Sequence, residues 1–169
     1  MSADHRVVIV DDEPDLADLY ASWLSGDYAV STAYDGREAL DVLDDSVDVV
    51  LLDRRMPGTS GDEVLERIRD RELDCGVAMI TAVDPDFDIL ELGFDAYLTK
   101  PVAASDLAAV TTRLIRRSEY TDTLREFFAK LSTRETLAAE KPEFELEADE
   151  RYLELEAEID RLREESEAY

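Results

Sequence analysis

The chain has 169 residues, 43 of them Asp or Glu and 18 of them Lys or Arg, which gives a formal net charge of −25. A hydrophobic content of 45% excludes a wholly disordered chain, and a part of about 100 residues is long enough to bury roughly two thirds of the surface that its unfolded form exposes. The negative charge argues against unaided binding to nucleic acid or to an anionic membrane.

Short runs rich in β-branched residues alternate with amphipathic segments of helical length along the first two thirds of the chain. We expect strands over residues 7–10, 28–33, 47–52, 77–81 and 96–99. We expect helices over residues 14–25, 36–44, 61–71, 86–92 and 105–118. This alternation predicts an α/β fold built on a five-stranded, parallel, doubly wound sheet.

Beyond residue 118 the pattern is helical only, and Pro142 is its one strong break. Two apolar stripes follow helical spacing, Tyr120, Leu124, Phe127, Phe128 and Leu131 before the proline and Tyr152, Leu155, Ile159 and Leu162 after it. A single helix cannot bury either stripe by itself. The tail is therefore expected to form a helical hairpin or coiled coil, packed either on itself or on a second copy of the chain.

Three carboxylates follow the ends of two expected strands, Asp11 and Asp12 after the first and Asp53 after the third. Like charges at such close range raise one another's pKa, so a hard divalent cation is expected between them. Carboxylate, water and phosphate oxygens are the ligands of Mg²⁺, and the sequence has no Cys/His set of the kind that holds zinc. The alternative is that Asp11, Asp12 and Glu13 only favour the positive N-terminal end of the first helix.

Four segments occur in the order VVIVDDEPDL, VVLLDRRMPGTSG, VAMITA and DAYLTKPV. Together they resemble the signature segments of the response-regulator receiver domain of two-component signalling, over residues 6 to 118. The resemblance implies a CheY-like fold for a receiver domain at residues 1–118 and a helical tail at residues 119–169. It also implies a phosphoacceptor that catalyses its own phosphotransfer and dephosphorylation, rather than an enzyme, with a sensor histidine kinase as its partner.

The resemblance assigns roles to the strand-end residues. Asp53 corresponds to the phosphoacceptor. Asp12 and Asp53 would bind Mg²⁺ directly, Asp11 would hold it partly through water, and the main-chain carbonyl of Arg55 would supply a further ligand. Lys100 would pair with the phosphoryl oxygens. Phosphoryl transfer needs such positive charge around the transferred group and an in-line nucleophile, so these roles agree with the chemistry.

Other positions correspond to the switch and to the turns around the site. Thr81 would turn its hydroxyl to the phosphoryl group while Tyr97 turns inward behind it, which changes the face formed by the fourth helix, fifth strand and fifth helix. Pro101 would follow Lys100 in a cis peptide. The remaining turn residues are Pro57, Gly58 and Gly61.

Two arginines follow the expected phosphoacceptor. Arg55 is two positions after Asp53, and Arg54 adds a second positive charge beside it. We hypothesise that Arg55 modulates the lifetime of the phosphoryl group by contacting it or by obstructing the attacking water. A phosphohydrolase of the haloacid-dehalogenase type is disfavoured, because such enzymes need an aspartate where Arg55 stands.

Residues 124–165 are similar to the HalX tail that follows receiver domains in haloarchaeal regulators, a family described as transcriptional regulators. Residues 119–169 contain seventeen acidic and seven basic residues and have no helix-turn-helix pattern, which disfavours direct DNA contact. The first hypothesis is a phosphorylation-dependent regulator whose tail dimerises or docks on transcription or signalling machinery. The second is a stand-alone phosphate relay or sink whose tail only dimerises. A homodimer would form through the tail or through the face formed by the fourth helix, fifth strand and fifth helix.

The composition also suggests the cellular environment. The only lysines are Lys100, Lys130 and Lys141, and molar salt shortens the Debye length to about 3 Å, which would screen the self-repulsion of the acidic chain. We interpret this as a halophilic cytoplasm, with an acidic mesophilic protein as the alternative. The single Cys75 precludes an internal disulfide, and no targeting or membrane-spanning segment is evident, so a cytoplasmic location is expected.

Overall fold

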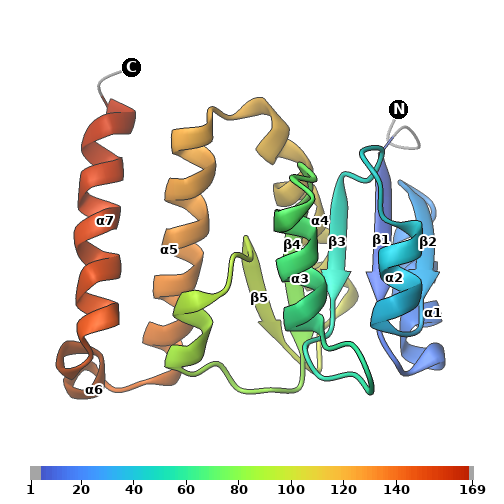
Figure 1. The fold of residues 1–169 in the computed structure, drawn as a ribbon, viewed down its shortest axis with the longest axis horizontal. Coiled ribbons are helices and arrows are strands. Elements are labelled where there is room, and N and C mark those ends of the chain that lie inside the picture. The colour runs from blue at the N-terminus through green and yellow to red at the C-terminus, as the bar shows by residue number, and fades with distance from the viewer. Residues whose placement is uncertain (1–4, 168–169) are drawn as a thin grey trace.

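A five-stranded parallel sheet forms the centre of the fold in the computed structural model, which describes residues 5–167, with Ser118 described by its backbone only (Figure 1). The strands are β1 (Arg6–Val10), β2 (Ala29–Ala33), β3 (Val49–Leu52), β4 (Gly76–Thr81) and β5 (Ala96–Thr99). Their order across the sheet is β2-β1-β3-β4-β5, and every pairing is parallel. The predicted fold class is therefore confirmed, and every predicted strand is present.

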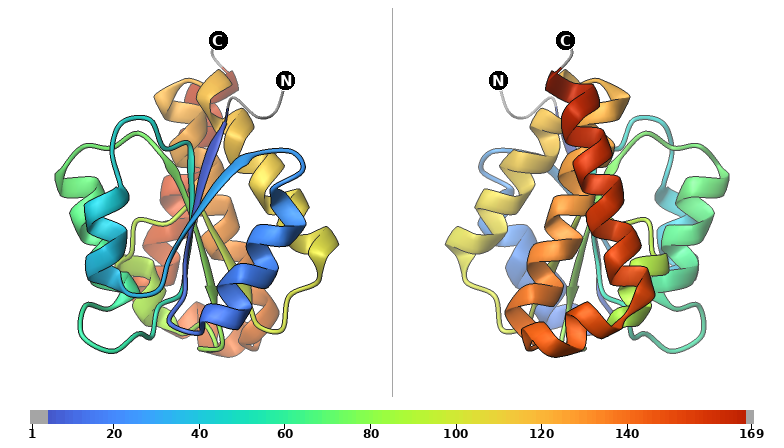
Figure 2. Two further views of the ribbon diagram at one scale, coloured as in Figure 1. Left: turned by 90° about the vertical axis from the view of Figure 1, so that its right-hand side faces the viewer. Right: turned by 90° about the vertical axis from the view of Figure 1, so that its left-hand side faces the viewer.

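Helices cover both faces of the sheet (Figure 2). They are α1 (Pro14–Leu24), α2 (Gly36–Val42), α3 (Gly61–Asp70) and α4 (Ala104–Arg116). Alternate residues of each strand point to opposite faces, so Val49 and Leu51 pack with α1 and α4, whereas Val50 and Leu52 pack with α2 and α3. This explains why all four residues of β3 are buried and apolar.

The helix expected over residues 86–92 is shorter than predicted. The structure has a single 3₁₀ segment, η2 (Phe87–Glu91), which begins after Asp86 and ends at Leu92, whose backbone is extended. So short an element cannot cover the edge strand β5. Part of the C-terminal tail covers β5 instead. The helix α5 (Asp122–Glu140) contacts both β5 and η2.

The tail begins after a break in the helical structure. A 3₁₀ turn, η3 (Arg117–Glu119), separates α4 from α5, and Thr121 caps the new helix by accepting a hydrogen bond from the Leu124 amide at 3.3 Å. After Pro142 come the short α6 (Glu143–Ala148) and the longer α7 (Glu150–Glu167). Figure 1 and the right-hand view of Figure 2 show α5 and α7 side by side and antiparallel, which is the predicted hairpin.

The hairpin buries the second apolar stripe within the same chain. All four of its members are at most 7% exposed, namely Tyr152, Leu155, Ile159 and Leu162. The first stripe is only partly covered, and the side chain of Phe128 stays 46% exposed. Leu137 of α5 and Ile159 of α7 share one apolar cluster with Ile89 of η2 and Tyr97 of β5. The tail therefore extends the core of the α/β domain beyond the edge of the sheet.

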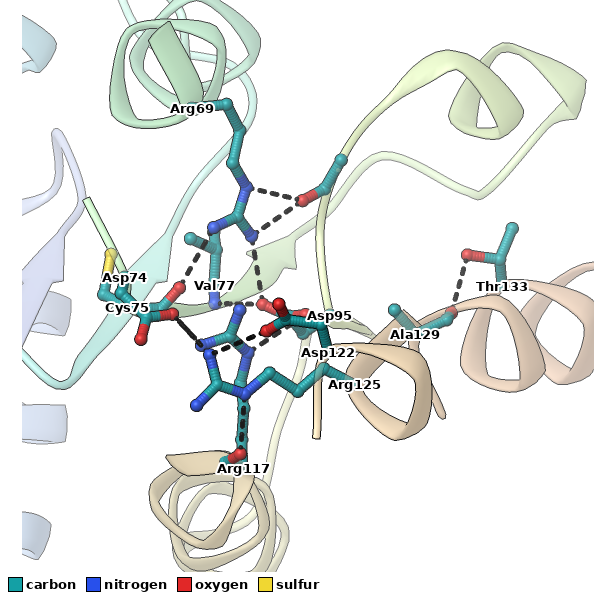
Figure 3. A network of polar contacts seen from close by, with 11 residues as sticks. Arg69, Asp74, Cys75, Val77, Asp95, Arg117, Asp122, Arg125, Ala129 and Thr133 are labelled. Atoms are coloured by element: carbon teal, nitrogen blue, oxygen red, sulfur yellow. Dashed lines mark hydrogen bonds and ion pairs between the residues drawn. The ribbon is translucent and has the colours of Figure 1, made fainter. Parts of the chain in front are cut away.

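Ion pairs fasten the start of α5 to the end of the sheet where the strands begin (Figure 3). The carboxylate of Asp74 accepts from Arg117 at 3.1 Å and from Arg125 at 2.8 Å. Asp95 pairs with Arg69 at 3.1 Å and with Arg117 at 3.4 Å. Residues of the α/β domain, of η3 and of α5 thus form one network, which holds this end of the tail in place. Among the helices of residues 5–167, none is long and apolar enough to cross a membrane.

Candidate functional site

Three carboxylates meet at the ends of β1 and β3. These are the strands between which the order of the sheet reverses, the usual ligand position in this class of fold. Asp11, Asp12 and Asp53 each offer a carboxylate oxygen, and these oxygens all lie within 4.8 Å of one another. Asp11 is 2% exposed and Asp53 is 7% exposed, whereas Asp12 is half-buried. The structure thus brings together the three residues that the sequence placed in a metal site.

Lys100 supplies a positive charge to this cluster from the end of β5. Its ammonium donates to Asp11 Oδ2 at 2.7 Å and to Asp53 Oδ2 at 3.0 Å. Burial disfavours the charged amine, but the hydrogen bonds to the two carboxylates outweigh it and raise the pKa of Lys100 to about 12. Burial raises the pKa of Asp11 in spite of this lysine. The peptide bond between Lys100 and Pro101 is cis, as the resemblance implies.

The donor set fits a magnesium ion. The ligand atoms are carboxylate oxygens, which a hard cation prefers. Three carboxylates and one ammonium leave two negative charges, which a divalent cation would balance. Burial raises the pKa of Asp11 even with Lys100 beside it, so a cation at this site would favour its charged form.

A tight loop after β3 holds Asp53 in place. The Arg55 amide donates to Asp53 Oδ1 at 3.2 Å, and the Gly61 amide donates to the carbonyl of Arg54 at 2.9 Å. A Cβ atom on Gly61 would lie 1.9 Å from the carbonyl oxygen of Asp53, so only glycine allows this approach. Gly58 has a φ of 76°, in the region that favours glycine. The predicted turn chemistry, including the exposed Pro57, is therefore present.

The two arginines lie in different environments. Arg55 is exposed, whereas Arg54 is 4% exposed and its guanidinium binds both carboxylate oxygens of Asp62 at 3.0 Å and one of Asp88 at 2.8 Å. Hydrogen bonds with Asp62 are the main reason that the pKa of Arg54 is raised above its ordinary value. Arg54 does place a second positive charge beside Arg55, but this charge is paired with two aspartates, Asp62 and Asp88.

Thr81 and Tyr97 meet at the main chain of Val83. The hydroxyl of Thr81, which is fully buried, accepts from the Val83 amide at 3.3 Å. Tyr97 is 7% exposed, and its hydroxyl donates to the Val83 carbonyl at 2.7 Å. Burial raises the pKa of Tyr97, so this hydroxyl keeps its proton. Both residues that the resemblance assigned to the switch are thus joined through one segment after β4.

Sequence reasoning missed the contacts of Arg54. Its Nη1 also donates to the hydroxyl of Tyr97, at 3.4 Å. The partners Asp62 and Asp88 are two among 43 acidic residues, and nothing in their local sequence distinguishes them. The only available signal was a second arginine directly after the expected phosphoacceptor, at the end of an apolar strand.

Comparison with known families gives two matches. Residues 7–112 match the response regulator receiver domain, and residues 116–169 match the HalX domain. A putative transcriptional regulator of Haloferax volcanii is 51% identical over 168 residues, which cover 99% of this chain and 29% of the relative. The chain therefore spans less than a third of the length of that relative.

Solved receiver structures are also similar. The signal receiver domain of a putative Luxo repressor protein from Vibrio parahaemolyticus is 26% identical, with a TM-score of 0.63 over 68% of this chain and 92% of that one. The response regulator TrrA from Thermotoga maritima, in complex with Mg²⁺ and BeF, is 32% identical, with a TM-score of 0.57 over 65% of this chain and 98% of that one. The chain belongs to the response-regulator receiver family, and its receiver domain is followed by a HalX domain.

Proposed function

We propose that this chain is a two-component response regulator in which Asp53 accepts a phosphoryl group from a sensor histidine kinase. The observation that carries the proposal is the position of the Asp53 carboxylate, which lies among Asp11 and Asp12 and accepts a hydrogen bond from Lys100 at 3.0 Å. In this role the chain is a phosphoacceptor that is switched by its own modification, rather than an enzyme with a separate substrate.

The geometry suits transfer of a phosphoryl group to a carboxylate. Lys100, with its pKa raised to about 12, is charged at neutral pH and lies beside the attacking oxygens of Asp53. As the phosphoryl group arrives, the ammonium of Lys100 can turn from the carboxylate to the phosphoryl oxygens and offset their charge. Asp11, Asp12, Asp53 and the main-chain carbonyl of Arg55 would hold Mg²⁺. When bound, this ion would neutralise charge that develops on the phosphoryl oxygens.

The same site has the parts of a switch. A phosphoryl group adds acceptor oxygens and negative charge to the tip of β3. The hydroxyl of Thr81 accepts a long hydrogen bond from the Val83 amide, and its own proton could be donated to the new oxygens. Movement of Thr81 would release the main chain of Val83, which the hydroxyl of Tyr97 also binds. The state of Asp53 is thereby passed to β5, against which the tail is packed.

We assign the output to residues 119–169, with residues 1–118 as the receiver, and the output is regulation of transcription or signalling. The description of the Haloferax volcanii relative and the HalX match support this assignment. In the alternative hypothesis, the phosphate relay or sink, the tail only dimerises. Burial of Tyr152 and Ile159 inside the hairpin weighs against it, because that stripe needs no second copy.

Intact-mass spectrometry after incubation with acetyl phosphate tests the proposal. We expect a single phosphoryl adduct that forms with Mg²⁺ and fails to form in EDTA. The Asp53→Asn variant should form no adduct under the same conditions. An adduct of equal yield in EDTA, or in the Asp53→Asn variant, would contradict the proposed function.

A further inference from the structure

Arg54 occupies an unusual position between the phosphoacceptor and the rest of the receiver. It follows Asp53 directly, yet the two side chains diverge, because Asp53 meets Lys100 while Arg54 enters the side of the sheet where Tyr97 packs. Consecutive residues at the end of a strand point to opposite faces, and this alternation explains the divergence. Asp53 and Arg54 therefore link the phosphorylation site to the opposite face of the sheet.

The guanidinium of Arg54 connects three elements. It binds Asp62 in the first turn of α3 through two parallel hydrogen bonds, Asp88 of η2 at 2.8 Å, and the hydroxyl of Tyr97 at 3.4 Å. Because the side chain of Arg54 is only 4% exposed, these partners rather than water determine where its guanidinium lies. The planar, forked donor geometry of arginine is what allows it to bind all three at once.

The far side of η2 contacts the tail. Lys141, directly after α5, pairs with Asp86 at 2.9 Å, and its ammonium lies 5.3 Å from the centre of the Phe87 ring. Arg151 of α7 lies 6.0 Å from the same ring centre. Within the apolar core, Ile89 of η2 belongs to the same cluster as the buried residues of α5 and α7. Contacts from Arg54 on one side and from the tail on the other thus hold η2.

Side-chain contacts form a continuous path from Thr81, at the end of β4, to η2, which the tail contacts on its other side. Thr81 contacts Val83, Val83 contacts the hydroxyl of Tyr97, and that hydroxyl contacts Arg54. Arg54 then contacts Asp88. Each step is a hydrogen bond or ion pair of a side chain, so Thr81 and Arg54 are connected through Val83 and Tyr97.

The two ends of the tail are held differently. In Figure 1 the strands point downward, η2 lies near their lower ends with α6, and α5 begins at the upper end. At that upper end the network of Asp74, Asp95, Arg117 and Arg125 anchors the tail far from the phosphorylation site (Figure 3). At the lower end the contacts through η2 lie on the path from Arg54. The upper end is suited to act as a pivot, and the lower end to respond.

We propose that Arg54 is a positioning residue that transmits the state of Asp53 to the HalX tail through η2. This inference rests on the proposed function, because its input is a phosphoryl group on Asp53. With the site unmodified, Arg54 holds Tyr97 and Asp88 together and η2 stays packed against Lys141 and α7. When Thr81 turns to the phosphoryl group, the Val83 segment and Tyr97 shift, Arg54 loses one of its partners, and η2 loosens its hold on the lower end of the tail.

Hydrogen exchange measured by mass spectrometry on the full chain tests this coupling, with Mg²⁺ and beryllofluoride as the probe. Fluorine NMR records bound beryllofluoride in the same samples. In the wild type we expect faster exchange at residues 137–153 when the probe is bound, and little change at residues 122–129. In Asp88→Asn we expect the probe to bind as in the wild type, while the response at residues 137–153 falls by about two-fold or more.

Asp88 is a better position than Arg54 for the variant that tests this coupling. Its side chain is 57% exposed, and the substitution removes the negative charge that pairs Arg54 with η2 while it leaves Arg54 paired with Asp62. Arg54→Lys should give the same loss, because a lysine keeps the charge but not the fork. Arg67→Ala is the matched control, since Arg67 is an exposed arginine of α3, and its response should equal that of the wild type.

The outcomes separate the two claims. If the wild type shows no bound beryllofluoride, the proposed function is contradicted and this inference with it. If the probe binds but residues 137–153 of the wild type do not respond, the inference alone is overturned. It is also overturned if Asp88→Asn and Arg54→Lys bind the probe and respond like the wild type, or if Arg67→Ala loses the response as they do.

Discussion

The guanidinium of Arg125, in the first turns of α5, lies 2.8 Å from the carboxylate of Asp74, in the loop that follows α3. Arg117 of η3 donates to the same carboxylate at 3.1 Å, so a single aspartate binds one arginine just before the tail and one within it. Partial burial works against the charged carboxylate, but the hydrogen bonds from the two arginines outweigh it and lower the pKa of Asp74 below its ordinary 3.8.

Asp74→Asn is therefore expected to destabilise the protein in a pH-dependent way. A lowered pKa in the folded state adds stability above pH 3.8, and this stability is lost as the pH falls through the folded-state pKa. Because the carboxylate is 65% exposed, we expect a loss of only about 0.5–1 kcal/mol at pH 7. Urea unfolding of both proteins at several pH values measures it. A difference that stays constant down to pH 3, at the level seen at pH 7, would contradict the assignment.

The tail is expected to unfold together with the receiver, because one apolar cluster includes residues of both. Ile159 of α7 is fully buried in that cluster, and Ile159→Ala should lower the free energy of unfolding by about 2–4 kcal/mol. Leu153, on the same helix, is 45% exposed, and Leu153→Ala should cost less than about 1 kcal/mol. Calorimetry should show one transition in each variant. Similar losses in the two variants, or a separate transition for the tail, would disprove the shared core.

Periodicity in the sequence predicted the sheet well because a parallel strand buried on both faces needs an unbroken apolar run, as at residues 49–52. It also predicted that Ile159 is buried, since spacing defines an apolar face. It could not show what that face packs against. The hairpin docks beside β5 because the short η2 leaves this edge strand uncovered. No local sequence pattern indicates how much of a strand a neighbouring segment will cover.

Gly61→Ala is predicted to disturb the loop that carries Asp53. The added Cβ would lie 1.9 Å from the carbonyl oxygen of Asp53, so the backbone of one segment must move. We expect a loss of about 3 kcal/mol in the free energy of unfolding and a slower reaction with acetyl phosphate. Gly26→Ala is the control, because a Cβ there meets nothing within 4 Å. Equal stability of the two variants in urea would show that the loop is not as tightly fitted as described.

Magnesium should stabilise the folded chain through the carboxylate cluster. Binding to the folded state alone adds about 1.4 kcal/mol when the ion is present at ten times its dissociation constant. We expect the melting temperature to rise with MgCl₂ by more than with KCl of the same ionic strength. Asp12→Asn removes one of the three carboxylates and should abolish this excess. An equal excess in the variant would place the ion elsewhere.

The site residues were predictable because each follows the end of a strand and the sheet brings those ends together, as for Asp11, Asp53 and Lys100. The surroundings of Arg54 were not. An arginine beside a carboxylate has the same local sequence whether it faces solvent or is buried, and its partners Asp62 and Asp88 are 8 and 34 positions away in the chain. Only the tertiary structure distinguishes a free charge from a paired one.

The most direct test of the account is to locate the phosphoryl group. After reaction with acetyl phosphate and Mg²⁺, borohydride reduces an aspartyl phosphate to homoserine, and peptide mapping then identifies the residue that carried it. The account predicts homoserine at position 53 in the wild type and none in Asp53→Asn. Homoserine at Asp11 or Asp12 of the wild type, or an undiminished yield in Asp53→Asn, would contradict the assignment of Asp53 as the phosphoacceptor.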